Sequence, residues 1–185
     1  MRDINELIGK EFEFEGKGYK VFGAKFEEDM ILLSTEIKEQ NTKKKYALSE
    51  MSKAYFKNVH PYLVEVMTTA ITDSPYDFRI TAGARTAKEQ NALYQIGRTR
   101  AGNKVTNADG YKNKSNHQVK SDGYGYAVDL YPFFDGKVQV NHPETIKKLK
   151  VIAEHIKKVA KSMGIKIVWG GDFKSLYDPP HFELS

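Results

Sequence analysis

The sequence predicts an α+β protein in which a small antiparallel sheet is flanked by helices and preceded by a small N-terminal β module. Residues 1–48 contain short stretches with the two-residue alternation of half-buried strands. Residues 49–185 instead combine short apolar runs, typical of buried strands, with longer segments whose apolar residues recur at helical spacing. We therefore expect two domains, a β module over 1–48 and a larger domain over 49–185.

The composition is that of an ordinary globular protein. Of 185 residues, 40% are apolar and 29% charged, which suffices for one sizeable core and a small appendage. The absence of cysteine excludes a disulfide framework and a thiolate metal site. The N-terminus has no apolar signal-peptide core, so we expect synthesis in the cytoplasm without ordinary export. The net charge of +5 favours an acidic partner, for which nucleic acid is the simplest candidate.

The N-terminal module is predicted from four short strands. Residues 11–15 alternate glutamate and phenylalanine, and a glycine-containing turn separates them from a second extended stretch at 19–22. Further strands are expected at 30–35 and 46–48, the last after a basic loop. Three or four such strands would form a small curled sheet or barrel.

Helices are expected where apolar residues follow a 3.6-residue period. A short helical connection is expected at 49–56, and Pro61 fits the first turn of a helix that ends before Ser74-Pro75. Thr86 and Glu89 have the spacing of a capping box, so a helix should start there and end near Gly97. Its inward residues are predicted to be Ala92, Leu93 and Ile96.

The clearest helix follows Pro143 and stops at Gly164. Its predicted apolar stripe consists of Ile146, Leu149, Ile152, Ala153, Ile156, Ala160 and Met163. Strands are expected at 78–81, 127–131, 165–169 and 181–184, and a long polar loop at 98–125.

Three residues of the larger domain suggest metal chemistry. His117 lies in the polar loop, while Asp129 and His181 lie in predicted strands. Two histidines and one aspartate form a ligand set that leaves one position open on a catalytic zinc. A carboxylate inside a buried strand is costly unless a metal or another cation compensates it. Asp178, three residues before His181, could act on a metal-bound water. Spacing alone leaves purely structural roles open for these residues.

The chain resembles the zinc peptidases that include VanY-type D-alanyl-D-alanine carboxypeptidases and phage L-alanyl-D-glutamate endolysins. The resemblance runs in order across roughly residues 59–184. It rests on the stretches Val59-His60-Pro61, Ser74-Pro75-Tyr76-Asp77-Phe78, Ile80-Thr81-Ala82-Gly83-Ala84-Arg85-Thr86, Glu89-Gln90, Leu93-Tyr94, Gly97-Arg98-Thr99, Val105-Thr106-Asn107-Ala108, Ser115-Asn116-His117, Ala127-Val128-Asp129-Leu130, Trp169-Gly170-Gly171-Asp172-Phe173 and Asp178 to Glu183. It implies a Hedgehog/DD-peptidase-like fold.

The resemblance also implies a ligand set and a mechanism. His117, Asp129 and His181 would bind one Zn²⁺ with water in the fourth place, and Asp178 would be the general base. Arg85, in the family's Gly-x-Arg pattern, would hold a substrate oxygen, whereas spacing alone favours a surface arginine. Asp172 is the alternative base.

The implied substrate is a peptidoglycan stem peptide. We favour an endolysin that cuts between L-Ala and D-Glu, is monomeric, has no nucleic-acid partner and no membrane insertion, and reaches the wall after holin-type release. Anionic wall polymers are a further expected partner. A D-Ala-D-Ala carboxypeptidase and a non-catalytic wall-binding protein are the alternatives. The 1–48 module would either target the wall or dock on the catalytic domain.

One departure from the family concerns the gap between the first two ligands. Eleven residues, 118–128, separate His117 from Asp129, more than in many members, which indicates a lengthened turn. The sequence leaves two roles open for each of two other residues. Ser115 either forms a hydrogen bond near the site or is a loop serine without a role there, and Trp169 either packs in the core or lines the groove. The remaining histidines, which we do not expect to bind metal, are His60, His142 and His155.

Overall fold

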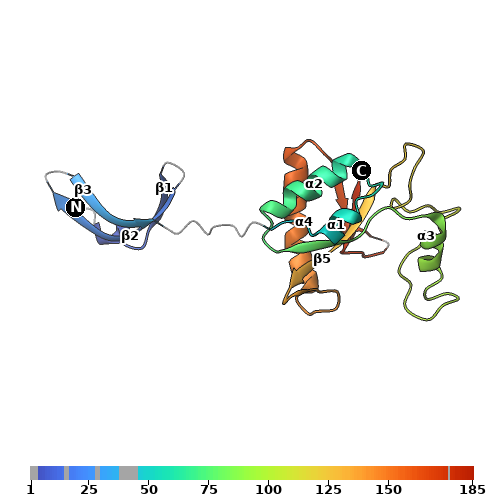
Figure 1. Cartoon of the computed structure of the whole chain (residues 1–185). Coiled ribbons are helices and arrows are strands. Elements are labelled where there is room, and N and C mark those ends of the chain that lie inside the picture. Colours follow the sequence, from blue (N-terminus) through green and yellow to red (C-terminus); the bar gives the residue numbers. More distant parts are fainter. Residues whose placement is uncertain (1–3, 15–16, 28–29, 38–45, 175) are drawn as a thin grey trace. The chain divides into compact units, whose positions relative to one another are not determined.

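The computed structural model describes residues 4–14, 17–27, 30–37, 46–174 and 176–185, and the chain divides into two compact units, Met1–Lys44 and Lys45–Ser185. In the first unit, a 3-10 turn (η1, Ile4–Leu7) precedes three strands. These strands are β1 (Glu11–Phe14), β2 (Lys17–Glu27) and β3 (Met30–Ile37) (Figure 1). They pair antiparallel in the order β1-β2-β3, at the positions where three of the four expected strands lie.

The fourth expected strand, at 46–48, is not formed. These residues have no regular secondary structure, and Leu48 is buried in the core of the second unit. They lead into α1 (Glu50–Ala54), where the Ser49 side chain caps the helix by accepting from the Ser52 amide. The Ser52 hydroxyl in turn accepts a hydrogen bond from the Ile80 amide at 3.1 Å, which fixes α1 against the sheet.

The sheet of the second unit is antiparallel and has the order β4-β5-β8-β7, with β6 (Lys137–Val138) paired to β5. The four strands that follow one another in this order are β4 (Phe78–Ala82), β5 (Ala127–Phe134), β8 (His181–Leu184) and β7 (Ile167–Trp169). All four strands were expected from the sequence. A 3-10 turn, η2 (Gly170–Asp172), follows β7.

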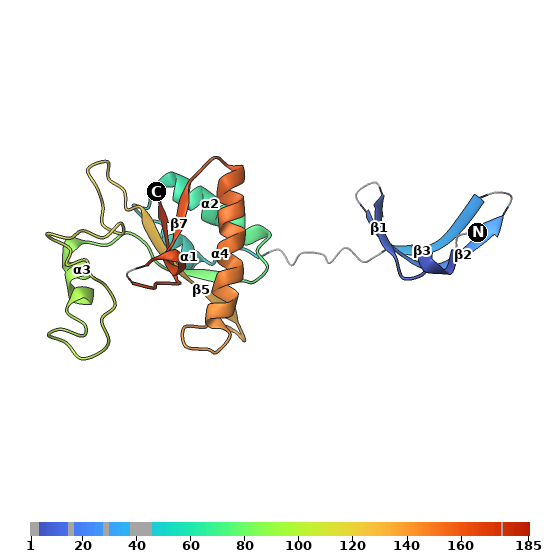
Figure 2. The same ribbon diagram turned by 180° about the vertical axis from the view of Figure 1, so that it is seen from behind.

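Two long helices, α2 (Pro61–Thr72) and α4 (Thr145–Ser162), pack against each other, and α4 also packs against β5 and β7 of the sheet. Figures 1 and 2 both show them on the side of the unit opposite to α3 (Ala87–Tyr94). The fully buried side chains between helices and sheet include Leu63, Met67, Phe78, Ile80, Leu130, Leu149, Ile152, Ile156 and Phe182. This core supports the strands that carry the site.

Two expected helix faces need correction. Ile146 is 41% exposed, and Thr145 is buried in its place, with its hydroxyl donating to the Gln139 carbonyl at 2.9 Å. In α3 the capping box forms as expected, but Ala92 is exposed and the buried residue is Gln90. The reason is that α3 packs on the polar loop, where Gln90 donates to the Thr106 hydroxyl and the Ala108 carbonyl.

Between α3 and β5 the chain forms no helix and no named strand over residues 95–126, as expected for the polar loop. No helix in the described part of the chain has the length and apolar character needed to cross a bilayer.

Candidate active site

Two of the expected ligands meet because their strands are neighbours in register. Asp129 in β5 is paired directly with His181 in β8. Side chains of directly opposed residues in an antiparallel pair lie on the same face of the sheet, about 4.5–5.5 Å apart at Cβ. The His181 Nδ1 atom is 3.3 Å from Asp129 Oδ1. The pairing of two short strands therefore builds half of the site.

The third expected ligand, His117, lies on the polar loop. The loop is tied to the end of β4 by a hydrogen bond of 2.8 Å from the Arg85 amide to the His117 carbonyl. The His117 ring nitrogen Nδ1 donates to the Gly83 carbonyl at 2.8 Å. Gly83 has no room for a side chain, since a Cβ atom would lie 1.8 Å from the Tyr55 carbonyl oxygen. The loop residues between His117 and Asp129 do not separate the ligands, because His117 Nε2 lies 3.1 Å from Asp129 Oδ1.

The three side chains direct acceptor atoms toward one another. His117 uses Nδ1 as a donor to a carbonyl, which leaves a lone pair on Nε2. The other ring nitrogen of His181, Nε2, lies 2.8 Å from the Glu183 carboxylate and donates to it, which leaves a lone pair on Nδ1. These two lone pairs face each other at 3.1 Å, beside a carboxylate oxygen of Asp129. Such a set is repulsive unless a proton or a metal cation lies between its members.

The donor set therefore fits a metal ion. One ligand atom from each of His117, Asp129 and His181 lies within 4.8 Å of the others, and both histidines are buried. Two imidazole nitrogens and one carboxylate oxygen are ligands common to divalent transition metals. A proton could take the place of the cation between these acceptors. Burial alone lowers the pKa of His181, but its hydrogen bonds to Asp129 and Glu183 outweigh burial and raise that pKa to about 9.

Arg85 contacts the same carboxylate from the other side. Its guanidinium forms an ion pair with Asp129 Oδ2, while Asp129 Oδ1 faces the histidines. Burial raises the pKa of the Asp129 carboxyl, but His117, His181 and Arg85 together hold it well below the usual value. Asp129 is therefore ionised at all physiological pH values and available as a ligand. The Arg85 side chain is 19% exposed and lines the cleft.

The cleft around these groups has a volume of about 570 Å³. Asp178 lines it, and burial together with the negative charge of Asp129 raises the pKa of its carboxyl. Tyr131 also lines it; burial and the charges of Asp129 and Asp178 raise the pKa of its hydroxyl, so this group stays a proton donor at neutral pH. Leu93 and Ile96, expected in a core, lie in the cleft wall instead.

Several smaller expectations are decided by the structure. The Ser115 hydroxyl accepts from the His117 amide at 3.3 Å, so this serine shapes the turn that presents the ligand. Trp169 is a core residue, 5% exposed, and its indole donates to the Pro179 carbonyl at 2.7 Å. Asp172 is an ion-pair partner of Lys157 at 2.8 Å and does not line the cleft. It is therefore poorly placed as an alternative base.

The other histidines have structural roles. His60 and His142 accept hydrogen bonds from the amides of Tyr62 and Glu144 at the starts of α2 and α4. The His155 ring donates to the Ala70 carbonyl at 2.9 Å and so links α4 to α2.

Sequence reasoning missed the role of Glu183. Residues two apart in a strand lie on the same face, so its position relative to His181 in a strand could have revealed the contact. The pairing of Arg85 with Asp129 had no comparable signal, because 44 residues separate the two.

A set of acceptors that fits a metal ion, with a half-buried acid beside it in an open cleft, is the arrangement of a hydrolytic enzyme. Comparison with known proteins gives the family. The chain belongs to the phage L-alanyl-D-glutamate peptidases, whose family model matches residues 44–184.

Individual relatives carry the same description. The chain is 32% identical over 130 residues to the peptidoglycan L-alanyl-D-glutamate endopeptidase CwlK of Bacillus subtilis, covering 69% of this chain and 74% of CwlK. It is 26% identical over 153 residues to the L-alanyl-D-glutamate peptidase of Escherichia phage T5, covering 75% and 98%. The crystal structure of the Serratia marcescens L-Ala D-Glu endopeptidase ChiX matches with a TM-score of 0.59 and 26% identity, over 78% of this chain and 94% of ChiX.

Proposed function

We propose that this protein is a zinc-dependent endopeptidase that hydrolyses the amide bond between L-Ala and D-Glu in peptidoglycan stem peptides. The observation that supports a bound metal ion is the convergence of three acceptor atoms on one point. These atoms are His117 Nε2, His181 Nδ1 and Asp129 Oδ1. The family and the named relatives support the bond that is cut, and they favour it over removal of terminal D-Ala. The ligand-bearing antiparallel sheet also supports a Hedgehog/DD-peptidase-like fold.

Zinc fits this donor set best among common metals, because it accepts two imidazoles and a carboxylate and keeps one position open. Bound there, it would supply Lewis acidity, which lowers the pKa of water from about 15.7 toward about 7 and polarises a carbonyl. The roles of the remaining residues follow from their positions in the cleft.

Asp178 is the proposed general base. As a carboxylate it accepts a proton from the attacking water while the water oxygen bonds to the L-Ala carbonyl carbon. The same proton then passes from Asp178 to the D-Glu nitrogen as the C–N bond breaks. The raised pKa of Asp178 favours the first transfer, because a more basic carboxylate takes up a proton more readily, and the carboxylic acid so formed is still more acidic than the amine that it protonates.

Arg85 and Tyr131 are the proposed donors to the substrate. Each lines the cleft, and each remains a hydrogen-bond donor at neutral pH. An oxygen of the scissile group that gains negative charge would be stabilised by donors already in place. Arg85 therefore has two contacts in the proposal, one to Asp129 and one to the substrate.

The first prediction separates metal binding from proton transfer. We expect His181→Ala to lose both metal and activity, because a ligand is removed. We expect Asp178→Asn to keep the metal but lose at least about 100-fold in kcat, the usual scale of general-base catalysis. Metal content by elemental analysis and product masses from a defined muropeptide are the measurements.

Asp178→Asn also provides its own folding control. A carboxyl whose pKa is raised in the folded state disfavours that state at pH values where it is ionised, so the amide variant should be at least as stable as the parent at pH 7. Near-normal turnover by Asp178→Asn would refute the assigned base. Release of D-Ala instead of a fragment starting with D-Glu would refute the assigned bond.

A further inference from the structure

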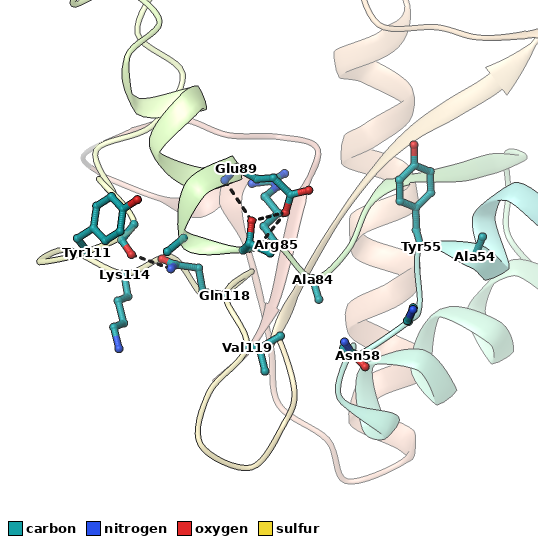
Figure 3. Close-up of a pocket in the computed structure, with 14 residues that line it drawn as sticks. Ala54, Tyr55, Asn58, Ala84, Arg85, Glu89, Tyr111, Lys114, Gln118 and Val119 are labelled. Carbon is teal, nitrogen blue, oxygen red and sulfur yellow. Dashed lines mark hydrogen bonds between the residues drawn. The ribbon is translucent and has the colours of Figure 1, made fainter.

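A second pocket, of about 650 Å³, adjoins the catalytic cleft. Three segments form it: the end of α1 with the residues that follow, the residues leading into α3, and the part of the polar loop around 110–119. Figure 3 shows Tyr55 and Tyr111 on opposite sides of this pocket, with Arg85 and Gln118 between them.

The pocket and the catalytic cleft have two lining residues in common. Arg85 and Lys114 line both cavities. The Arg85 guanidinium also pairs with Asp129, one of the proposed metal ligands. The second pocket therefore begins one side chain away from the proposed metal site, close enough for one substrate molecule to occupy both cavities.

The lining of the pocket combines aromatic, small and polar residues. Tyr55 is 39% and Tyr111 61% exposed, so both rings offer apolar surface and a hydroxyl to a ligand. Four residues with small side chains or none leave space between them: Ala54, Ala84, Ala87 and Gly110. Asn58 and Lys114 add hydrogen-bond donors. The carboxylate of Glu89, the acidic residue of the lining, is bound by the Thr86 amide and hydroxyl in the capping box.

The lengthened turn between His117 and Asp129 helps to build this pocket. Val119, in that turn, lines the cavity. The turn docks on the segment after α1 through Gly125, whose amide donates to the Asn58 carbonyl at 2.7 Å and whose carbonyl accepts from the His60 amide at 2.9 Å. The extra residues thus leave the metal ligands together and contribute a wall to the neighbouring cavity.

The chemistry of the proposed substrate suggests an occupant, so this step rests on the proposed function. In peptidoglycan the nitrogen of the stem L-Ala is acylated by the lactyl group of a muramic acid sugar. Only one amino-acid residue, about 3.3–3.6 Å of extended chain, separates that acyl group from the scissile bond. A sugar must therefore lie directly beside the catalytic cleft whenever the natural substrate is bound.

We propose that the second pocket is the subsite for the sugar that carries the stem peptide. A sugar ring has an apolar C–H face that packs on a tyrosine ring, and a polar rim that needs hydrogen bonds. Tyr55 and Tyr111 supply the rings, while Asn58 and Lys114 supply donors for hydroxyl and N-acetyl oxygens. The pocket thereby selects stem peptides still attached to the glycan strand.

The test compares two substrates that share the scissile bond. One is a disaccharide-linked muropeptide, and the other is the same stem peptide with an acetyl group in place of the sugar. We expect the wild type to cleave the sugar-bearing substrate with a kcat/KM about tenfold higher or more. In Tyr55→Ala/Tyr111→Ala this preference should fall to about twofold or less, through KM rather than kcat, because ground-state binding is lost. Activity on the acetyl peptide should be unchanged.

Tyr62→Ala is the matched control, because Tyr62 is an exposed tyrosine, 58% accessible, that lines neither cavity. It should keep the full preference. Equal cleavage of both substrates by the wild type would overturn the sugar subsite alone. Equal losses on both substrates in the double variant would also overturn it and assign the pocket to the peptide. Failure of the metal-loaded wild type to cleave either substrate would refute the proposed function and the subsite together.

Discussion

At the scale of single residues, the site depends on which nitrogen of each histidine is free. His117 is held by a backbone carbonyl, a partner that only accepts hydrogen bonds. His181 is held by the Glu183 carboxylate, which also makes its imidazole more basic and a better metal ligand. Burial raises the pKa of Glu183, but hydrogen bonds from His181 and Asn116, together with the charges of His181 and His117, outweigh burial and keep that pKa below the usual value. Glu183 is therefore ionised when it orients His181.

This contact leads to a prediction for Glu183→Gln. The amide oxygen can still accept from His181, but the negative charge is lost, so we expect metal affinity to fall about 10–100-fold. Metal competition with a chromophoric chelator measures the change. Glu65→Gln is the control, since Glu65 is exposed on α2 and lines neither cavity. A Glu183→Gln variant that binds metal as tightly as the parent would show that Glu183 does not support the ligand.

Asp178 gives a prediction for the pH dependence. Burial and the charge of Asp129 raise its pKa, and the base must be ionised to accept a proton. Activity should therefore fall as the pH decreases through a value above the ordinary aspartate pKa of about 3.9. The measurement is kcat/KM against pH at saturating metal, with metal content determined at each pH so that loss of the ion is recognised. An acid limb at or below about pH 3.9 with metal still bound would contradict the assignment.

At the scale of elements, the site depends on how the segments around it end. The bonds between Thr86 and Glu89 start α3 immediately after Arg85, so the arginine stands at a fixed junction of loop and helix. Gly170 has a comparable function after β7. A Cβ atom there would lie 2.2 Å from the Asp178 carbonyl oxygen and 2.9 Å from the His181 Cβ. The turn that carries Asp178, the proposed base, and His181, a proposed ligand, packs directly on this glycine.

The capping box predicts the cost of Thr86→Ala. Loss of the N-cap oxygen should reduce the free energy of unfolding by about 1 kcal/mol. Urea unfolding followed by tryptophan fluorescence measures it, because the single tryptophan, Trp169, lies in the core of the same unit. Thr69→Ala, on the exposed side of α2, should cost nothing, since alanine has the higher helix propensity. Equal effects of the two changes would contradict the role of the cap.

At the scale of the whole molecule, charge is divided unevenly between the two units. Residues 1–44 contain eight Lys and Arg against ten Asp and Glu, a net charge of −2, whereas residues 45–185 contain 21 against 14, a net charge of +7. An anionic wall polymer would be attracted by the larger unit. Targeting by the N-terminal unit would have to use contacts other than net charge.

Removal of residues 1–44 tests this division. We expect kcat/KM on a soluble muropeptide to stay within about twofold, because the described core and cleft lie in the second unit. Retention on purified cell walls should persist and weaken with salt, as screened electrostatic attraction does. If the shortened chain hydrolyses the muropeptide but no longer binds walls, the N-terminal unit is a targeting module.

Local patterns predicted the elements well and their surroundings less well. Short apolar runs, helical spacing, the capping box and the proline and glycine positions located the helices of the second unit and its strands β4, β5, β7 and β8, but not the two-residue strand β6. The same patterns misplaced Ala92, Ile146 and the strand at 46–48, because a period shows which residues share a face and not what that face meets. Burial is decided by partners that are distant in sequence.

The sequence by itself determined the kinds of groups available for chemistry: two histidines, two aspartates and an arginine, each at a loop or strand position that could be identified beforehand. The tertiary structure decided that three of them converge, which ring nitrogens are free, and that the long turn builds a second cavity rather than dividing the site. The physical reason is the distance along the chain over which each kind of interaction acts. Residue type and local backbone preference depend on neighbours in the chain, whereas His117 and His181 meet across 64 residues only through strand register and core packing.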